Sequence, residues 1–485
     1  MGFVQDIQII LNNLKGLFLI IGIVMLAMAI FSWWVGDAPA LYGFLSGAVL
    51  GIGTGLVIRM LVPGNINPEL KHAMIIAALA YLIVPAISMI PFMTLANMSP
   101  LDAFFESISG WTGSGFSMLS SPETAPPMVQ FWRSVTQWIG GLGVIVLMVT
   151  ILIRPGTSTY MFYQSEAHKD KIHPSIRSTI KTIWALYIVL SICGFLLLYA
   201  AGMPVWDATN TAMTAIGTGG FALYGSSLAA YDNILIELVI LPIIIAGAMP
   251  FVVIYRMFRK GPGSLLKNVQ VRTFFMIIAI GSVVLTIQNY FFYNDIVSSL
   301  RYSVFQFISA ITSAGFQTAD LSSWTTPALL IMSVAMVIGG CAGSTSSGIK
   351  IARAIFLGDQ IRLWFAKVLR SKNAIAVIKI GNKRVTEDLV AAELTEATFI
   401  SFLWVVGIVL SVFIIANIVG PTYDLGHIIF EVSSAMGNVG ITCGLVNPGL
   451  SALGKIVFIF DMWIGRLEII PVMLLARYVL NGFKF

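Results

Sequence analysis

Long apolar runs separated by short polar connections make up most of this chain. A run of about 20 apolar residues, folded as a helix that rises 1.5 Å per residue, is long enough to cross a lipid bilayer. Counted this way, the pattern predicts about ten spanning helices. They lie near residues 17–35, 40–62, 72–95, 128–153, 181–202, 232–258, 272–293, 326–340, 397–420 and 452–480.

Four shorter segments between these runs resemble one another. Each combines apolar residues with serine or threonine and ends in a glycine: Gly115, Gly220, Gly315 and Gly440. Six positions before these glycines stand four matching hydroxyl residues, Ser109, Thr214, Ser309 and Ser434. A helix over residues 101–112 covers less than about 20 Å, so segments of this length cannot cross a bilayer.

Each short segment lies between two spanning runs, so the chain repeats one unit of helix, half-helix and helix. Two spans per unit return the chain to the same side, and the units can then be related by an axis along the membrane normal. We therefore predict an all-α membrane protein with four parallel M1–P–M2 repeats in pseudo-fourfold symmetry around a central pore. The predicted boundaries are 1–65 for an additional N-terminal hairpin and 71–155, 175–260, 268–360 and 390–482 for pore repeats 1 to 4.

Charge patterning predicts how the chain is oriented in a membrane. Only 10% of the residues are charged, against about 25% in a soluble protein, and 58% are hydrophobic. The basic residues crowd three connections, 154–181, 256–272 and 350–384, and are sparse in the connections that carry the short segments. The positive-inside rule places the basic loops in the cytoplasm and opens the four short segments outward. The net charge of +6 therefore reflects topology and not a nucleic-acid partner.

Glycine at the end of four inward-pointing half-helices suggests a cation filter. A monovalent cation loses its water shell only where carbonyl oxygens replace it, and glycine adopts the backbone angles that this requires. The C-terminal ends of the half-helices add partial negative charge. The alternative is that each glycine only caps a re-entrant helix. The predicted filter comprises Thr112, Gly113, Ser114, Gly115, Gly217, Thr218, Gly219, Gly220, Thr312, Ser313, Ala314, Gly315, Gly437, Asn438, Val439 and Gly440.

A run of small and polar residues interrupts the eighth apolar run at 339–348. Such a sequence does not hold a stable helix, so it can form a mobile plug below the filter or a simple packing kink. Its candidate gating residues are Gly339, Gly340, Gly343, Ser344, Thr345 and Gly348.

Three charged side chains, one inside an apolar run and two inside the short segments, need partners or a water-filled path. Arg466 lies about midway along the last run and can face the ion path or pair with Glu468 or Asp461. Glu106 and Glu431 stand nine residues before their glycines, and we expect a structural role for both, with Arg133 paired to one of them. The three cysteines are scattered and no His/Cys cluster is present, so no disulfide framework or zinc site is predicted.

These features resemble the Trk/Ktr/HKT superfamily of potassium transporters, and within it the TrkH family, over essentially the whole chain. Besides the four short segments, the resemblance includes residues 131–143 (FWRSVTQWIGGLG), 339–350 (GGCAGSTSSGIK) and 465–468 (GRLE). It implies potassium selectivity, because members that pass sodium carry serine at the position of Gly115. It also implies that 339–348 is an intramembrane gating loop and that Arg466 projects into the pore beside it.

The resemblance further implies a homodimer in the cytoplasmic (inner) membrane and a cytosolic, nucleotide-binding, TrkA-like regulatory ring, for which the basic stretch 350–392 offers a docking face. No cofactor is predicted in this chain, and potassium is its substrate. The chain carries no nucleophile–base constellation, so an enzyme is not predicted. The prediction is potassium uptake through a gated, channel-like pathway, and the alternative is a proton- or sodium-coupled symporter.

Overall fold

The computed structural model describes residues 3–62, 69–147, 176–369, 379–380, 383–384 and 387–481. Within them the regular secondary structure is helical apart from a short antiparallel pair, β1 (Lys379–Ile380) with β2 (Lys383–Arg384). Several basic residues of the predicted cytoplasmic loops lie outside the described residues. They include Arg154, Lys169, Lys171 and Lys372.

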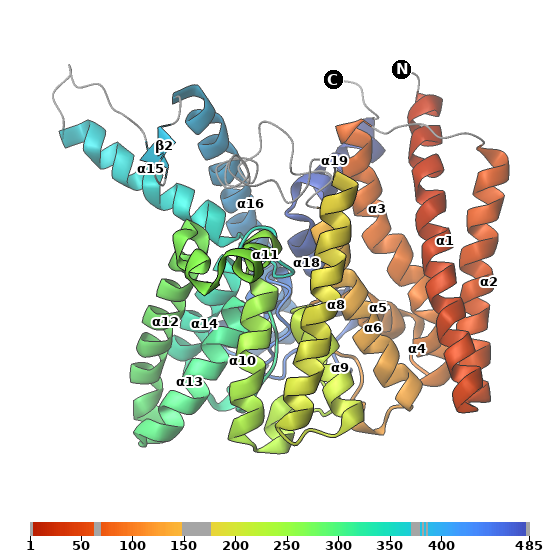
Figure 1. The fold of residues 1–485 in the computed structure, drawn as a ribbon, viewed down its shortest axis with the longest axis horizontal. Helices are drawn as coiled ribbons and strands as arrows, with labels where there is room; N and C mark the ends of the chain where they lie inside the picture. The colour runs from red at the N-terminus through yellow and green to blue at the C-terminus, as the bar shows by residue number, and fades with distance from the viewer. Residues whose placement is uncertain are drawn as a thin grey trace.

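An N-terminal hairpin of α1 (Phe3–Val35) and α2 (Ala38–Leu61) stands at one edge of the molecule (Figure 1). Small residues let the two helices approach closely. A Cβ placed on Gly51 would lie 2.9 Å from the Cα of Gly22, so the two backbones are in direct contact there. Asp37 begins α2 by accepting a hydrogen bond from the backbone N–H of Ala40.

The remaining helices form the four repeats that the sequence predicts. Repeat 1 comprises α3 (Leu70–Ser88), α4 (Ile90–Leu95), α5 (Pro100–Thr112), η1 (Pro122–Thr124) and α6 (Pro127–Leu147). Repeat 2 comprises α8 (Ile176–Ala200), α9 (Val205–Ile216), η3 (Ser227–Tyr231), α10 (Ile234–Ala248) and α11 (Phe251–Lys260), followed by η4 (Pro262–Lys267). Repeat 3 comprises α12 (Val269–Tyr293), α13 (Ile296–Ile311), η5 (Leu321–Ser323), α14 (Thr326–Ile338) and α15 (Ile351–Leu369). Repeat 4 comprises α16 (Glu387–Val419), η6 (Gly420–Thr422), α17 (Leu425–Met436), α18 (Ala452–Leu467) and α19 (Ile470–Asn481).

Not every apolar run that the sequence predicts is a single spanning helix among the described residues, and the run 128–153 extends beyond them. Six described helices are long and apolar enough to cross a membrane, and the bent pair α10–α11 would be a seventh. The second helices of repeats 2 to 4 are broken, which hydropathy does not register. Pro250 lies in the break of the first, Gly339 ends the helical part of the second, and left-handed Glu468 and Ile469 separate α18 from α19.

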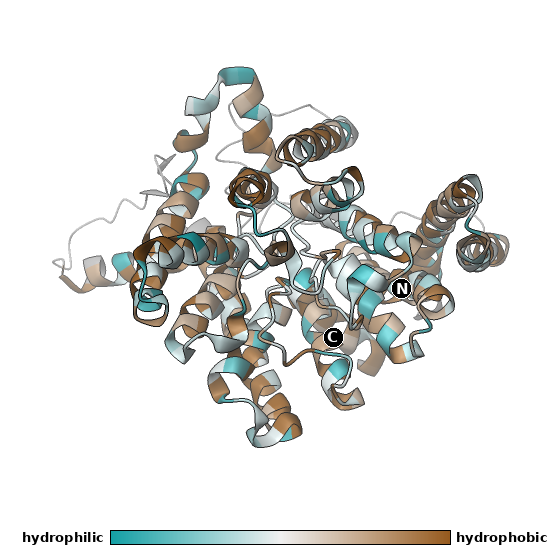
Figure 2. Ribbon diagram, turned by 90° about the horizontal axis from the view of Figure 1, so that it is seen from below, coloured by the Kyte–Doolittle hydropathy of each residue, from teal (hydrophilic) through white to brown (hydrophobic). Residues whose placement is uncertain are grey.

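The half-helices α5, α9, α13 and α17 lie in the chain between the first and second helices of their repeats. Figure 1 shows the start of α1, α15 and the start of α16 at one end of the molecule, with α9 and α13 toward the other end. In the view turned by 90°, non-helical segments gather near the middle and hydrophobic residues cover much of the surrounding helices (Figure 2). Large apolar side chains such as Phe291 and Phe413 are exposed on the outside, as expected for a surface solvated by lipid.

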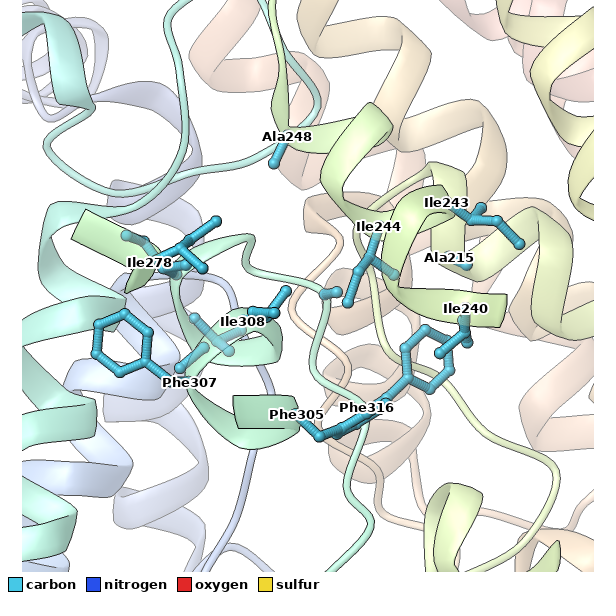
Figure 3. Packing of buried hydrophobic residues seen from close by; sticks show 14 of the residues in the cluster. Ala215, Ile240, Ile243, Ile244, Ala248, Ile278, Phe305, Phe307, Ile308 and Phe316 are labelled. Atoms are coloured by element: carbon cyan, nitrogen blue, oxygen red, sulfur yellow. The ribbon is translucent and has the colours of Figure 1, made fainter. Parts of the chain in front are cut away.

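Buried apolar side chains join neighbouring repeats. In the largest cluster, Ile240 and Ile244 of α10 pack near Phe305 and Ile308 of α13 (Figure 3). Phe316, directly after the glycine of repeat 3, lies in the same cluster and is fully buried. This packing between repeats 2 and 3 fixes where the segments after the half-helices can lie.

Candidate functional site

All four half-helices end in the same way. Two residues before each glycine stands a residue with a left-handed φ: Gly113 (68°), Thr218 (49°), Ser313 (55°) and Asn438 (49°). The next N–H then donates back to the carbonyl of the matching hydroxyl residue, from Ser114 to Ser109, Gly219 to Thr214, Ala314 to Ser309 and Val439 to Ser434, over 2.8–3.0 Å. The residues that align in sequence therefore make equivalent hydrogen bonds, and the helix cap lies before the final glycine and not on it.

The four final glycines form a closed ring. Their φ values are 87°, 78°, 79° and 78° for Gly115, Gly220, Gly315 and Gly440. A Cβ on any of them would lie within 3.0 Å of a carbonyl oxygen of the next repeat. The pairs are Gly115 with Gly219, Gly220 with Ala314, Gly315 with Val439, and Gly440 with Ser114. The order runs from repeat 1 to 2, 3, 4 and back to 1, so backbone from four quarters surrounds one axis too closely for any side chain at these positions. We call the four residues ending in each of these glycines a filter segment.

Two side chains, one in α6 and one in the filter segment of repeat 4, hold filter segments in place. Gln137 of α6 donates through Nε2 to the carbonyl of Gly219 over 2.6 Å and accepts from the N–H of Phe221 over 3.0 Å. In the segment of repeat 4, Asn438 donates to the hydroxyl of Ser114 over 2.7 Å and so joins repeats 4 and 1. Gln137 is not among the site residues that the sequence predicts. The available signal was an amide within an apolar run, which does not show what the amide binds.

The hydroxyls of the first residue in two filter segments form hydrogen bonds within their own half-helices. Thr112 and Thr312 each bond the carbonyl four residues earlier in their own helix over 2.7 Å. These side chains stabilise the last turn of α5 and α13. The other predicted filter residues lie in the four segments, in the ring or directly beside it.

Glu106 and Glu431 hold the chain just beyond the ring. Glu106 accepts from the N–H of Met118 over 2.6 Å and pairs with Arg133 Nε over 2.7 Å, as the sequence predicts for one of the two glutamates. Glu431 accepts from the N–H of Cys443 over 2.8 Å and of Leu445 over 3.2 Å. Both are buried and bound to protein groups, so their role is structural.

The segment 339–348 leaves α14, turns back on the side of the ring nearer α15 and returns to its starting point. We refer to this side as below the ring. Gly339 and Gly348 have left-handed φ values of 70° and 90°, and a Cβ on Gly348 would lie 2.8 Å from the Cα of Gly339. The N–H groups of Ile349 and Lys350 donate to the carbonyls of Val337 and Ile338, each over 2.9 Å. We call 339–348 the loop and this meeting point its neck.

Repeat 2 anchors the loop. Thr345 donates to the carbonyl of Gly247 through both its N–H, over 3.1 Å, and its hydroxyl, over 2.9 Å. Cys341 donates to the carbonyl of Ala248 over 3.0 Å, and Phe251 donates to that of Gly343 over 3.2 Å. The break between α10 and α11 thus exposes the backbone groups that bind the loop.

Arg466 lies between the loop and the first filter segment. It donates to the carbonyl of Thr345 over 2.9 Å, to the hydroxyl of Ser347 over 3.0 Å and to the carbonyl of Gly140 over 3.3 Å. A Cβ on Gly113 would be 3.7 Å from its guanidinium nitrogens.

The two acids considered as partners for this arginine bind other groups. Glu468 pairs with Lys350 over 3.0 Å and with Arg353, and Asp461 accepts from Ser411 over 2.6 Å. The guanidinium of Arg466 therefore carries its charge directly below the ring.

At the opposite end from α15, polar contacts join each repeat to the next. Glu123 accepts from the N–H of Gly225, Arg301 pairs with Glu237, Thr326 donates to Asp424, and Lys455 pairs with Asp102. A backbone hydrogen bond from His427 holds the pKa of Asp424 at about 2, so this carboxylate stays ionised at the start of α17.

No group of three or more His, Cys, Asp or Glu side chains that could hold a metal ion occurs among the described residues. The structure also describes only part of the basic stretch 350–392, and residues 370–378, 381–382 and 385–386 lie outside it. The predicted docking face therefore stays a prediction.

Comparisons with known proteins agree with this architecture. The family model described as "TrkH: Cation transport protein" matches residues 59–482. An uncharacterized cation transporter of Methanocaldococcus jannaschii is 34% identical, over 97% of this chain and 95% of that protein. The Trk system potassium uptake protein TrkG of Escherichia coli is 30% identical, over 85% of each chain. The crystal structure of the potassium transporter TrkH from Vibrio parahaemolyticus has the same fold, with a TM-score of 0.85 and 24% identity over 97% of this chain and 98% of that one.

Proposed function

Because the chain belongs to the TrkH family of cation transport proteins, we propose that it takes up potassium across the cytoplasmic membrane through a channel-like, gated pathway. The observation that carries this proposal is the closed ring of four glycines. Four backbone segments that meet around one axis can supply carbonyl oxygens from every side of an ion. A ring of this kind recognises a dehydrated cation and leaves no space for side-chain ligands.

Selectivity for potassium over sodium follows from the glycine of repeat 1. The backbone at Gly115 has a φ of 87°, and a Cβ there would meet the carbonyl oxygen of Gly219. Serine at this position would displace that carbonyl and deform one quarter of the ring. The relatives described as Trk system potassium uptake proteins support potassium as the substrate.

The loop and Arg466 form the gate of this pathway. The loop lies below the ring, and Arg466 fixes it there with a positive charge that opposes the passage of a cation. Conduction requires the loop to move aside.

The full system includes partners outside this chain. We propose a homodimer in the inner membrane with the filter segments facing outward, regulated by a cytosolic, nucleotide-binding, TrkA-like ring that docks on the basic stretch 350–392. The name of the relatives, Trk system, supports regulatory components besides the membrane subunit. The chain itself takes no cofactor or nucleic acid, and potassium is its cargo.

One observation favours the alternative of a proton- or sodium-coupled symporter. Asp461 is buried in α18, where it accepts a hydrogen bond from the neutral hydroxyl of Ser411. An acidic residue in such a place can carry a proton. A relay would need further acidic groups in sequence, and the sequence places few acidic residues inside its apolar runs.

Flux measurements separate the two mechanisms. The purified chain in liposomes receives a potassium gradient while the proton and sodium gradients are held at zero. We expect potassium flux under these conditions, and equal flux for Asp461→Asn. Flux that appears only with a proton or sodium gradient and is lost in Asp461→Asn would establish the symporter instead.

A further inference from the structure

The loop touches the filter itself. We call Thr345, Ser346 and Ser347 the loop tip. The hydroxyl of Thr218 donates to that of Thr345 over 3.0 Å, and the hydroxyls of Ser313 and Ser346 lie 3.0 Å apart. All four side chains are buried. The filter segments of repeats 2 and 3 are therefore joined to the loop by direct hydrogen bonds between side chains.

Thr218 and Ser313 occupy the left-handed position of their segments, with φ values of 49° and 55°. This region is uncommon for residues other than glycine and asparagine, and a β-branched residue such as threonine is a clear outlier there. Repeats 1 and 4 carry Gly113 and Asn438 at the same position, residue types that adopt it at low cost. The strained residue types thus occur in the two repeats whose filter side chains bond the loop tip.

The side-chain hydrogen bonds of the residue at this left-handed position also differ between the repeats. Asn438 is held by Ser114 and by the carbonyl of Met462 over 2.8 Å, and neither partner belongs to the loop. Thr218 and Ser313 have their hydroxyls on Thr345 and Ser346. A sparsely populated backbone conformation persists only where its surroundings hold it in place. Displacement of the loop removes that support from repeats 2 and 3 and leaves it intact in repeat 4.

We propose that Thr218 and Ser313 are positioning residues that couple the gate to the filter. The loop, while it is in place, holds the filter segments of repeats 2 and 3 in their left-handed geometry, and its displacement relaxes them. Coupling between two sites is reciprocal, so a change at these hydroxyls also shifts the equilibrium of the loop. This inference rests on the proposed function, because it concerns how a potassium filter responds to its gate.

Single-channel recording of the purified full chain in planar bilayers, with potassium on one side and sodium on the other, tests the coupling. Thr218→Val and Ser313→Ala remove the hydroxyls and keep the strained backbone. Each loses one hydrogen bond to the loop, and we expect an open probability about fivefold above wild type. Thr286→Val is the matched control, because its hydroxyl bonds the carbonyl of Ser282 within α12. We expect wild-type behaviour from that control.

Glycine variants provide a second measurement, the potassium-to-sodium permeability ratio, which would not change if these residues had a purely structural role. Thr218→Gly and Ser313→Gly remove the hydroxyl and also the strain, because glycine adopts the left-handed region freely. They should open as often as the valine and alanine variants, yet show a higher potassium-to-sodium permeability ratio in the open state. Equal ratios in the two sets would contradict the proposal.

A double-mutant cycle tests the pair directly. If the hydrogen bond between Thr218 and Thr345 carries the effect, Thr218→Val should add nothing to the open probability of Thr345→Val. Additive effects, or unchanged opening in both Thr218→Val and Ser313→Ala, would overturn the proposal. Absence of potassium current in the wild type would instead contradict the proposed function, so the two failures are distinguishable.

Discussion

At the scale of single residues, two glutamates at equivalent positions of repeats 1 and 4 both hold the chain just beyond the ring, but they bind different partners. Glu106 is neutralised by Arg133, whereas Glu431 is bound by neutral donors. The sequence predicts the pair with Arg133 because an intramembrane charge needs a partner, and that prediction is confirmed. It does not predict that Arg133 also donates to the carbonyl of Ala222 over 2.9 Å, since this contact depends on how repeats 1 and 2 pack.

Removal of Arg133 should therefore destabilise the protein strongly. Arg133→Gln leaves the buried carboxylate of Glu106 without its counter-ion, and breaking such a pair costs about 3–5 kcal/mol. Thermal unfolding in detergent should show a large fall in midpoint. The double variant Glu106→Gln/Arg133→Gln removes both charges and should recover part of the loss. A double variant less stable than Arg133→Gln alone would contradict this account.

At the scale of elements, the breaks in the second helices decide what the site can do. Hydropathy predicts that residues 232–258 and 452–480 are single spans, but the carbonyls exposed at the first break bind the loop and the second break follows Arg466. A proline or an arginine in an apolar run is visible in the sequence. Which backbone groups a break exposes, and which loop they receive, depends on tertiary contacts and could not be predicted.

Loss of Arg466 should release the loop. Arg466→Ala removes two hydrogen bonds from a charged group to the loop, each worth about 1.5–3 kcal/mol, so potassium flux should rise about tenfold or more. The matched control is Arg301→Ala, which also removes an arginine that bridges two repeats but lies in the first half of α13, away from the filter segment and the loop. Unchanged or lower flux in Arg466→Ala, at normal expression, would refute the role assigned to this residue.

The neck of the loop should tolerate no side chain. In Gly339→Ala the new Cβ meets the carbonyl of Ser347 and the backbone of Gly348, so the neck must open and the loop must shift. We expect raised potassium flux in the absence of any regulatory partner. Gly343→Ala is the control, because Gly343 has a similar φ of 80° but its Cβ would only touch Pro250 at 3.9 Å. Gly343→Ala introduces only the strain of a left-handed alanine, about 1–2 kcal/mol, and should change flux much less than Gly339→Ala.

At the scale of the whole molecule, four copies of one element form a ring that no single copy could form. The sequence is sufficient to predict the repeats, their parallel orientation and the glycines, because each of these leaves a periodic pattern. The asymmetry is not predictable in this way. Gln137 holds only the second segment, Asn438 joins the fourth to the first, and the loop bonds the second and third.

The central claim is that the ring of glycines selects potassium, and Gly115→Ser tests it most directly. The measurement is the reversal potential of the purified chain in a bilayer, with potassium on one side and sodium on the other. Gly202→Ser is the control, because Gly202 has a left-handed φ of 95° and open space around its Cβ position. The account predicts potassium selectivity in the wild type and in Gly202→Ser, and a marked loss of it in Gly115→Ser. Unchanged selectivity in Gly115→Ser would contradict the assignment of this ring as the filter.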